Sequence, residues 1–237
     1  MSQSPNFDHE NELKSQGYEL IAGIDEVGRG ALAGPVVAGA VILPHPANLS
    51  WLELVRDSKE LDSRKRESLF DLINNEAVAV GTGIVPSQVI DSVNILKATK
   101  LAMMQAVEKL PRQPGFLLID RLTLSQCPIP QRGITRGDKA CLSIACASIV
   151  AKVTRDRMME ELDVLYPGYG FARHKGYGTR EHISCLQKLG PSPVHRLYFA
   201  PVRNVMAGQS SAPFASRHSE EAERPKNLIQ GKLPEGL

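Results

Sequence analysis

YELIAGIDEVGRGALAGPVVAGAVILP, residues 18–44, places two apolar runs around an acidic pair. The first run, residues 20–24, ends on Asp25 and Glu26, and the second, residues 36–43, follows a glycine-rich segment. Apolar runs of this length, bounded by glycine and proline, predict two strands joined by an acidic turn. A strand end with two carboxylates beside an arginine and free backbone N–H groups suits metal and phosphate chemistry. A solvated hairpin turn is the competing interpretation.

Length and composition indicate an ordinary globular protein. A chain of 237 residues can bury one substantial core with a small appendage. Its apolar content of 42% and charged content of 23% are typical of this class. The net charge of +2 permits nucleic-acid binding without arguing for it. The polar N-terminus and the absence of any apolar run near 18 residues predict neither a signal peptide nor a membrane span.

The cysteines give no sign of a zinc site or a disulfide framework. They form no CxxC pair and no zinc spacing with the histidines. Cys141 and Cys146 lie in an apolar, helix-like run, where buried thiols are expected. We therefore expect a reducing, cytoplasmic setting.

After the first strand pair, helical and strand patterns alternate. They predict, in chain order, a helix from residues 62–63 with Leu69, Leu72 and Ile73 on one face, a strand at 77–85, a helix at 86–110, a strand at 116–119, a short strand at 133–136 and helices at 138–165 and 181–188. This order predicts an α/β fold with a mixed sheet flanked by helices. Residues 1–17 are expected to be a flexible tail, and residues 208–237 a disordered one.

Four carboxylates form the candidate site: Asp25, Glu26, Asp120 and Asp138. Asp25 and Asp120 both follow buried strands, so we expect them to meet where strand ends converge. Hard divalent cations prefer such oxygens, and two ions about 4 Å apart can drive phosphodiester hydrolysis. Neighbours on a strand point to opposite faces, so Asp25 and Glu26 share a site only if the strand breaks there or Glu26 uses its carbonyl.

Asp138 competes with Asp156 for the fourth place. They lie 18 residues apart on one predicted helix, roughly 27 Å along its axis, so one centre cannot use both. Asp156 sits between two arginines, which favours a surface ion pair, and we place Asp138 in the site. An ordinary helix N-cap is the alternative role for Asp138.

Two further loops contain polar groups. Residues 28–33 fit the weak dinucleotide pattern GxGxxA, but a strand rather than a helix is predicted to follow, which argues against a nicotinamide-dependent oxidoreductase. Residues 174–179 read HKGYGT, whose tyrosine is expected to be exposed and able to stack on a sugar or base. His195 is assigned a structural role.

Several segments together resemble ribonuclease HII, the type 2 ribonuclease H family, in family order over most of residues 20–202. The matching segments are GIDEVGRGALAGPVVAGAVIL at 23–43, DSKEL at 57–61, LLID at 117–120, GDKACLSIACASIVAKVTRD at 137–156, HKGYGT at 174–179 and GPSPVHRLYFAPV at 190–202. The resemblance implies a ribonuclease H-like catalytic domain at 18–165 and a small helical C-terminal extension at 166–207 that contacts nucleic acid.

The resemblance also implies an activity. The chain would hydrolyse the RNA strand of RNA–DNA hybrids and nick duplex DNA 5′ of single embedded ribonucleotides, leaving 3′-hydroxyl and 5′-phosphate ends. Mn²⁺ or Mg²⁺ would be required, in a two-metal site, and the protein would act as a monomer without a membrane or a small-molecule cofactor.

The resemblance assigns residues by position. Asp25, Glu26, Asp120 and Asp138 would be the catalytic, metal-binding carboxylates. The backbone of Gly28, Arg29 and Gly30 would contact the ribonucleotide 2′-hydroxyl, Tyr177 would pack on the ribose, and Lys59 would lie near phosphates.

Two positions depart from the family pattern. Arg121 follows the third carboxylate where glycine is usual, so it could crowd the metal site or tune it electrostatically. HRLYFAPV replaces HRRSFAPV, which is expected to alter nucleic-acid contacts rather than chemistry. The competing functions are another metal-dependent nuclease of the same fold acting on DNA, a binding module without catalysis, and the oxidoreductase.

Overall fold

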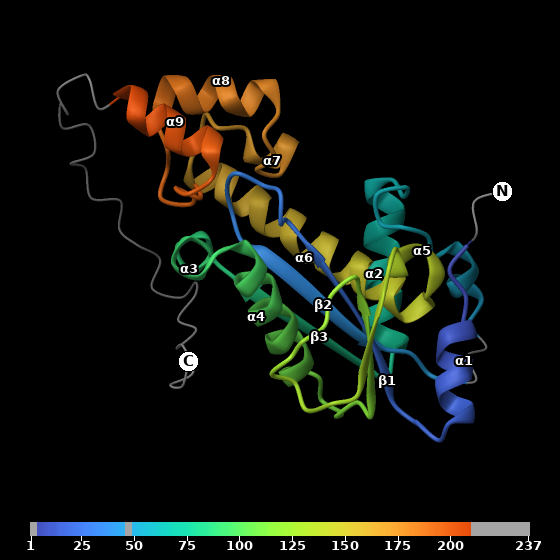
Figure 1. The fold of residues 1–237 in the computed structure, drawn as a ribbon. Helices are drawn as coiled ribbons and strands as arrows, with labels where there is room; N and C mark the ends of the chain where they lie inside the picture. The colour runs from blue at the N-terminus through green and yellow to red at the C-terminus, as the bar shows by residue number, and fades with distance from the viewer. Residues whose placement is uncertain (1–3, 46–48, 210–237) are drawn as a thin grey trace.

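A five-stranded mixed sheet forms the centre of the computed structural model, which describes residues 4–45 and 49–209 (Figure 1). The strands are β1 (Ile21–Val27), β2 (Val36–Ile42), β3 (Ala79–Val85), β4 (Phe116–Asp120) and β5 (Gln131–Ile134), in the order β3-β2-β1-β4-β5. β1, β2 and β3 pair antiparallel, whereas β4 lies parallel to β1 and β5 parallel to β4. The predicted mixed sheet is confirmed.

Helices cover both faces of this sheet. They are α1 (Asp8–Ser15), the 3-10 helix η1 (Ser50–Leu54), α2 (Ser63–Glu76), α3 (Ser87–Val93), α4 (Ile95–Glu108), α5 (Gly137–Ala140), α6 (Leu142–Leu165), α7 (Phe171–His174), α8 (Arg180–Leu189) and α9 (Ala200–Gln209). α4 packs on β2 and β3, α6 packs on β1 and β2, and α6 continues from the sheet toward α7, α8 and α9 (Figure 1). Within the described ranges, no helix has the length and apolar character needed to cross a membrane.

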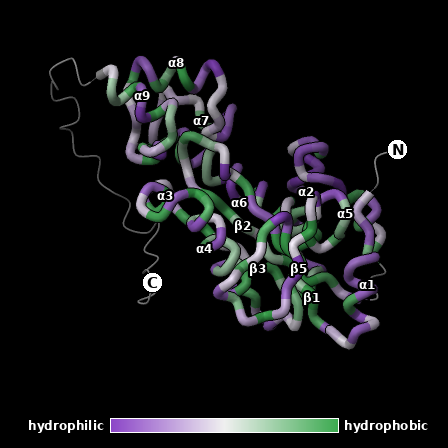
Figure 2. Tube along the Cα trace, in the orientation of Figure 1, coloured by the Kyte–Doolittle hydropathy of each residue, from purple (hydrophilic) through white to green (hydrophobic). Residues whose placement is uncertain are grey.

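Burial explains the strand patterns. β2 is buried at every residue and is continuously apolar, and β1 is buried at all but its last two residues, Asp25 included. β3, at the edge, alternates between buried and half-buried residues. Figure 2 shows the apolar residues gathered on the central strands.

Helix α6 lies close to the sheet at Gly23. A Cβ on this residue would stand 2.1 Å from the carbonyl carbon of Ser143, in the first turn of α6. Only glycine permits this approach. Because Asp25 lies two residues later on the same face, the close approach also sets the distance from α6 to Asp25.

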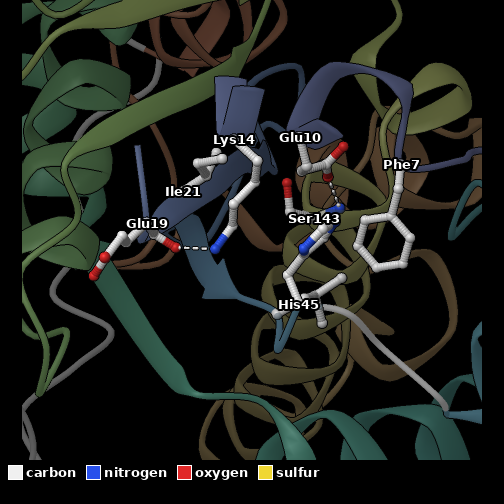
Figure 3. A pocket seen from close by; sticks show the side chains of 8 residues that line it. Phe7, Glu10, Lys14, Glu19, Ile21, His45 and Ser143 are labelled. Atoms are coloured by element: carbon white, nitrogen blue, oxygen red, sulfur yellow. Dashed lines mark hydrogen bonds between the residues drawn. The ribbon is translucent and has the colours of Figure 1, made fainter. Parts of the chain in front are cut away.

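The expectation of a flexible tail over residues 1–17 is wrong for the part that the structure describes. α1 occupies residues 8–15, and its Leu13 is fully buried. Glu10 Oε1 accepts a hydrogen bond of 3.0 Å from Ser143 N–H, one of the free donors at the start of α6 (Figure 3). A segment with few apolar residues is thus held by one fully buried leucine and by polar contacts, among them the helix-capping Glu10 and the Glu12–Arg132 ion pair.

Two predicted helices are each divided. The helix expected at 86–110 breaks at Asn94, which adopts φ 73° and accepts hydrogen bonds from Leu96 and Lys97 N–H through its side chain. The helix expected at 138–165 breaks at Cys141, whose backbone is extended. In both cases the apolar spacing continues across the break, so periodicity alone conceals it.

The prediction that a disordered tail begins at residue 208 needs a correction. α9, which sequence patterns did not predict, includes residues 208 and 209, so the tail does not begin at 208. Residues 210–237 and 1–3 lie outside the described part of the chain, as do residues 46–48 of the loop after β2.

Replacing Gly23 by alanine is expected to lower the free energy of unfolding by about 1–3 kcal/mol or more, because the added methyl group overlaps the backbone of α6. Urea unfolding measures the change. Gly30→Ala is the control, since a Cβ there meets nothing within 4 Å. It should stay within about 0.5 kcal/mol of the parent protein. Equal stabilities of the two variants would contradict the close approach of α6.

Candidate metal centre

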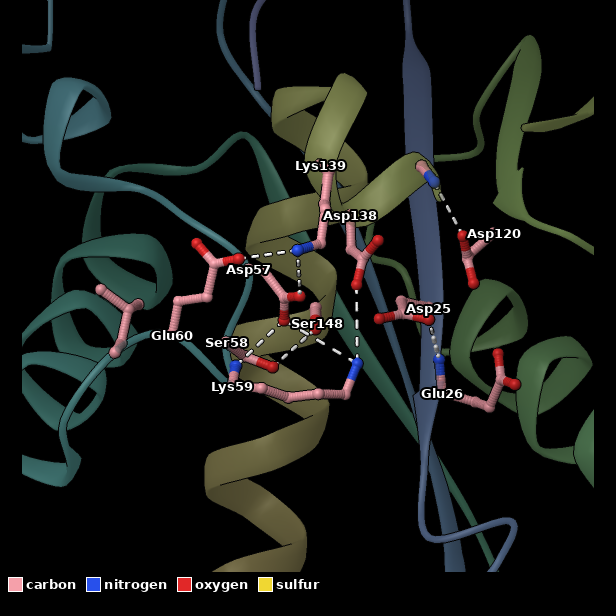
Figure 4. Close-up of polar contacts among 12 residues, drawn as sticks. Asp25, Glu26, Asp57, Ser58, Lys59, Glu60, Asp120, Asp138, Lys139 and Ser148 are labelled. Atoms are coloured by element: carbon pink, nitrogen blue, oxygen red, sulfur yellow. Dashed lines mark hydrogen bonds and ion pairs between the residues drawn. The ribbon is translucent and has the colours of Figure 1, made fainter. Parts of the chain in front are cut away.

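Three carboxylates come together at the ends of β1 and β4. One oxygen from each of Asp25, Glu26 and Asp120 can be chosen so that all lie within 4.8 Å of one another. The parallel register pairs Ile24 with Ile119, so the next residues, Asp25 and Asp120, leave adjacent strands side by side. The predicted meeting of strand ends is therefore confirmed (Figure 4).

Glu26 reaches this group without a break in the strand. β1 stays paired with β2 as far as Val27, so the strand break, one of the two conditions expected for a shared site, is absent. β4 ends at Asp120, which leaves the β4 side of β1 open beyond Asp25 among the described strands. Although neighbours on a strand point to opposite faces, a carboxylate oxygen of Glu26 lies within 4.8 Å of oxygens of Asp25 and Asp120.

Burial and mutual repulsion make the three carboxylates hard to ionise together. Burial raises the pKa of Asp25 well above its usual value, and the charges of Glu26 and Asp120 add to this effect. Burial also raises the pKa of Glu26, against the opposing effect of Arg29, whose Nη1 donates to Glu26 Oε1 at 3.0 Å. The pKa of Asp120 is raised chiefly by burial, although Gly137 N–H donates to its Oδ1 at 2.8 Å.

This donor set fits a hard divalent cation. Among the described residues, Glu26 Oε2 is one of two buried side-chain oxygens without a hydrogen-bond partner. A buried, unpartnered carboxylate oxygen is costly unless a ligand satisfies it. Carboxylate oxygens are what Mg²⁺ and Mn²⁺ prefer, and a cation would offset the repulsion among Asp25, Glu26 and Asp120.

Asp138 adjoins this group but is not among the three gathered residues. It lies in α5, is 8% exposed, and its Oδ2 stands 3.6 Å from Lys59 Nζ. Lys59 Nζ is also 3.8 Å from Asp57, so the lysine bridges two carboxylates beside the cluster (Figure 4). The pKa of Asp120 is raised chiefly by burial, and the nearby charge of Asp138 adds to the effect.

Asp156 lies away from the cluster, as predicted. Its Oδ1 stands 2.7 Å from Lys152 Nζ, four residues earlier in α6. The predicted ion pair therefore exists, but its partner is not one of the flanking arginines. The Asp156 side chain is only 15% exposed, so it is not a surface pair either.

The glycine turn and the Tyr177 loop are neighbours. Gly28 has φ +91°, and a Cβ on it would lie 2.2 Å from Arg155 Nε, so glycine is required. Ala31 forms a β-bridge with Tyr177, and Leu32 N–H donates to the carbonyl of Gly176 at 2.8 Å. Tyr177 is 36% exposed, as the sequence predicted for a tyrosine between glycines.

Two fully buried arginines hold these segments together, and sequence reasoning missed their role. Arg155 donates to the carbonyls of Pro35, Lys175 and Ala33 at 2.8–3.2 Å. Arg196 donates to the carbonyls of Arg29 and Gly34 at 2.8–3.1 Å. The available signal for Arg155 was its position four residues from both Ala151 and Met159, on a buried stripe of α6.

Arg121 occupies a backbone conformation that favours glycine. Its φ is 57°, and its Nε stands 3.8 Å from Asp120 Oδ2. The side chain is 61% exposed, so it does not crowd the cluster. Its positive charge opposes the rise in the pKa of Asp120, which favours the electrostatic interpretation of this departure.

The family model and the similar proteins that match this chain belong to one family. The model of the family described as Ribonuclease HII matches residues 22–202. A ribonuclease HII of Dehalococcoides mccartyi is 55% identical over 204 residues, covering 86% of this chain and 96% of the relative. A ribonuclease HII of Geobacter sulfurreducens is 52% identical over 197 residues, covering 83% and 89%.

Solved structures share the fold. The ribonuclease H2 from Pyrococcus horikoshii OT3 superposes with a TM-score of 0.68 at 25% identity, covering 81% of this chain and all of that one. The RNase HII from Archaeoglobus fulgidus, solved in complex with PCNA, gives 0.64 at 24% identity over 78% and 96%. Bst-RNase HIII in complex with Mn²⁺ gives 0.61 at 19% identity over 79% and 69%.

The raised pKa of Asp25 predicts the direction in which the stability of the protein changes with pH. A carboxyl whose folded-state pKa exceeds its unfolded value destabilises the folded protein as the pH rises through that range. Asp25→Asn removes this cost and keeps Oδ1 as acceptor for Glu26 N–H. In EDTA at pH 8 the variant should gain on the order of 1 kcal/mol in free energy of unfolding, and the gain should shrink as the pH falls.

Asp62→Asn serves as the control for this measurement. Asp62 caps α2 by accepting from Lys65 N–H, its pKa is lowered rather than raised, and asparagine caps a helix equally well. Urea unfolding at several pH values compares the two. A loss of stability in Asp25→Asn at pH 8 would mean that the carboxylate is not held at a cost.

Proposed function

The chain belongs to the ribonuclease HII family, and on that premise we propose that Asp25, Glu26, Asp120 and Asp138 form its catalytic metal centre. As a ribonuclease H it hydrolyses the RNA strand of RNA–DNA hybrids. We further propose that it nicks duplex DNA on the 5′ side of single ribonucleotides and leaves 3′-hydroxyl and 5′-phosphate ends. The gathering of three carboxylate oxygens within 4.8 Å carries the proposal.

Asp25, Glu26 and Asp120 would hold the ions, with Asp138 completing a two-metal site. In such a site Mn²⁺ or Mg²⁺ supplies activation of the attacking water and stabilisation of the departing 3′-oxygen. The chain's contribution is a preorganised frame: β1 and β4 fix two carboxylates on neighbouring strands, and Arg29 steadies Glu26. Repulsion among the carboxylates supports cation binding at this point.

Lysines beside the cluster suit the phosphates of the substrate. The Lys59 side chain is 72% exposed and that of Lys139 is 44% exposed, and both rest on Asp57. Ammonium groups that are anchored at this edge and open to solvent can attract a phosphodiester backbone toward the carboxylates. We assign Lys59 a phosphate contact.

The ribonucleotide would be recognised by two adjacent segments. The Gly28–Gly30 backbone would contact the 2′-hydroxyl, and the Tyr177 ring would pack on the ribose. Their connection through the Ala31–Tyr177 bridge supports action as one unit. The extension that carries Tyr177, residues 166–207, would then supply the nucleic-acid contacts beyond the metal centre.

All four cysteines are free thiols, which suits a reducing cytoplasm. Another nuclease of this fold that cuts DNA is the second candidate, and ribonucleotide dependence separates the two.

Asp120→Asn is expected to lose cleavage while retaining hybrid binding. Removing one metal-binding carboxylate should lower the single-turnover rate by about two to three orders of magnitude or more, with little change in the dissociation constant of the hybrid. Asp156→Asn is the matched control, because Asp156 pairs with Lys152 away from the cluster, and it should cleave at nearly the parent rate. Normal turnover by Asp120→Asn would remove Asp120 from the site.

A labelled DNA duplex with one internal ribonucleotide tests the substrate assignment. With Mg²⁺ or Mn²⁺ we expect cutting 5′ of the ribonucleotide, an intact all-DNA control, and no cutting in EDTA. Cutting of both duplexes would favour the DNA-directed nuclease. Binding without cutting in any metal would favour a binding module.

A further inference from the structure

Histidine side chains hold the backbone on both sides of Tyr177. The carbonyl of Tyr177 lies 2.9 Å from His182 Nδ1, and the N–H of Gly176 donates to His174 Nδ1 at 3.2 Å. His182 and His174 stack with ring centroids 4.3 Å apart. The proposed chemistry at the carboxylates uses none of these imidazoles, although they lie directly beneath the segment proposed to test the ribose.

The donor and the acceptor can be assigned for each hydrogen bond that links Ser192, His195, His182 and Tyr177. Ser192 N–H donates to His195 Nδ1 at 2.9 Å, so this nitrogen carries no proton, and neutral His195 is protonated on Nε2. That Nε2 lies 3.1 Å from His182 Nε2. A carbonyl only accepts, so His182 donates to Tyr177 from Nδ1 and receives at Nε2. The chain runs from Ser192 through His195 and His182 to Tyr177.

Burial keeps this chain neutral. His182 is fully buried and His195 is 2% exposed. Burial lowers the pKa of both imidazoles, that of His195 to about 4, with the neighbouring histidines adding to the effect. A proton added to either ring would remove the acceptor on which the next donor depends, so each ring has one tautomer near pH 7.

The same chain connects the two segments proposed to recognise the ribonucleotide. His195 forms a β-bridge with Ala33, and Gly34 N–H donates to the carbonyl of Val194 at 2.8 Å, so the start of the chain is attached to the segment after the glycine turn. Its far end is the carbonyl of Tyr177. The imidazoles thus fix Tyr177 relative to the turn.

We propose that His182, oriented by His195, is a positioning residue for Tyr177: it fixes the Tyr177 carbonyl so that the ring meets the ribose beside the glycine turn. This inference rests on the proposed function of Tyr177. The geometry favours it over a role in core packing alone, because an apolar ring would fill the same space without the directed bonds at Nδ1 and Nε2.

Two substitutions at one position separate the directed bond from packing. In His182→Asn the side-chain amide nitrogen stands near the place of Nδ1 and can still donate to Tyr177, whereas in His182→Gln it stands near Nε2. We expect His182→Gln to lower kcat/KM on the single-ribonucleotide duplex by about tenfold. His182→Asn should keep most of the activity. Urea unfolding of both shows whether they are equally folded.

A double-mutant cycle with Tyr177→Ala tests whether His182 acts through Tyr177. In that background His182→Gln should cause no further loss, because the ring that it positions is gone. An equal loss in both backgrounds, or equal activities of His182→Gln and His182→Asn, would overturn the positioning role. If Tyr177→Ala alone leaves cleavage and ribonucleotide dependence intact, the proposed function of Tyr177 fails, and the positioning role fails with it.

A spectroscopic readout checks the chain without activity. In ¹⁵N-histidine NMR of the full-length protein at pH 7, His182 should show the Nδ1-protonated tautomer and His195 the Nε2-protonated one. His182→Gln should change the resonances of Tyr177 and Gly176, whereas His182→Asn should change them less. The reverse tautomers would overturn the proposed direction of the chain.

Discussion

Repulsion among Asp25, Glu26 and Asp120 is the constraint on which the rest of the structure depends. Their oxygens approach within 4.8 Å, and burial raises the pKa of Asp25, with the charges of Glu26 and Asp120 adding to the effect, so the fold must hold these carboxylates in place against their own charge. Adjacent parallel strands do this for Asp25 and Asp120, and Arg29 partly offsets Glu26. The close packing of α6 at Gly23 leaves the strand no room to move away. A bound cation would offset the repulsion that the surrounding fold maintains.

Positive charge is distributed around this centre in two different ways. Lys59 and Lys139 remain partly exposed beside carboxylates, and under the proposed function they would meet the phosphates of the substrate. Arg155 and Arg196 are fully buried and donate their hydrogen bonds to backbone carbonyls. A planar guanidinium with five donors can hold several segments of the chain at once. The two buried arginines therefore fix the backbone of the segments proposed to contact the ribonucleotide, whereas the two exposed lysines would attract its phosphates.

Sequence patterns predict those features of the site that depend on residues close together in the chain. Asp25 and Asp120 were placed correctly because each follows an apolar run long enough to identify a strand end. α1 was missed because one buried leucine and a carboxylate that caps another helix leave no periodic pattern. The path of Glu26 was also beyond reach, since it depends on β4 ending at Asp120 while β1 continues to Val27. The imidazole chain brings together residues from three separate loops and helices, which spacing alone does not show.

Arg121 is the departure from the family pattern that lies beside the candidate metal centre. A left-handed backbone costs a non-glycine residue about 1–2 kcal/mol, so arginine at φ 57° is retained at some expense. Its exposed side chain fills no cavity, and its contribution is a charge 3.8 Å from Asp120. That charge favours the ionised form of a carboxyl that burial otherwise disfavours. It also lessens the net negative charge that attracts cations, so the residue stabilises the free site at the expense of its pull on a metal ion.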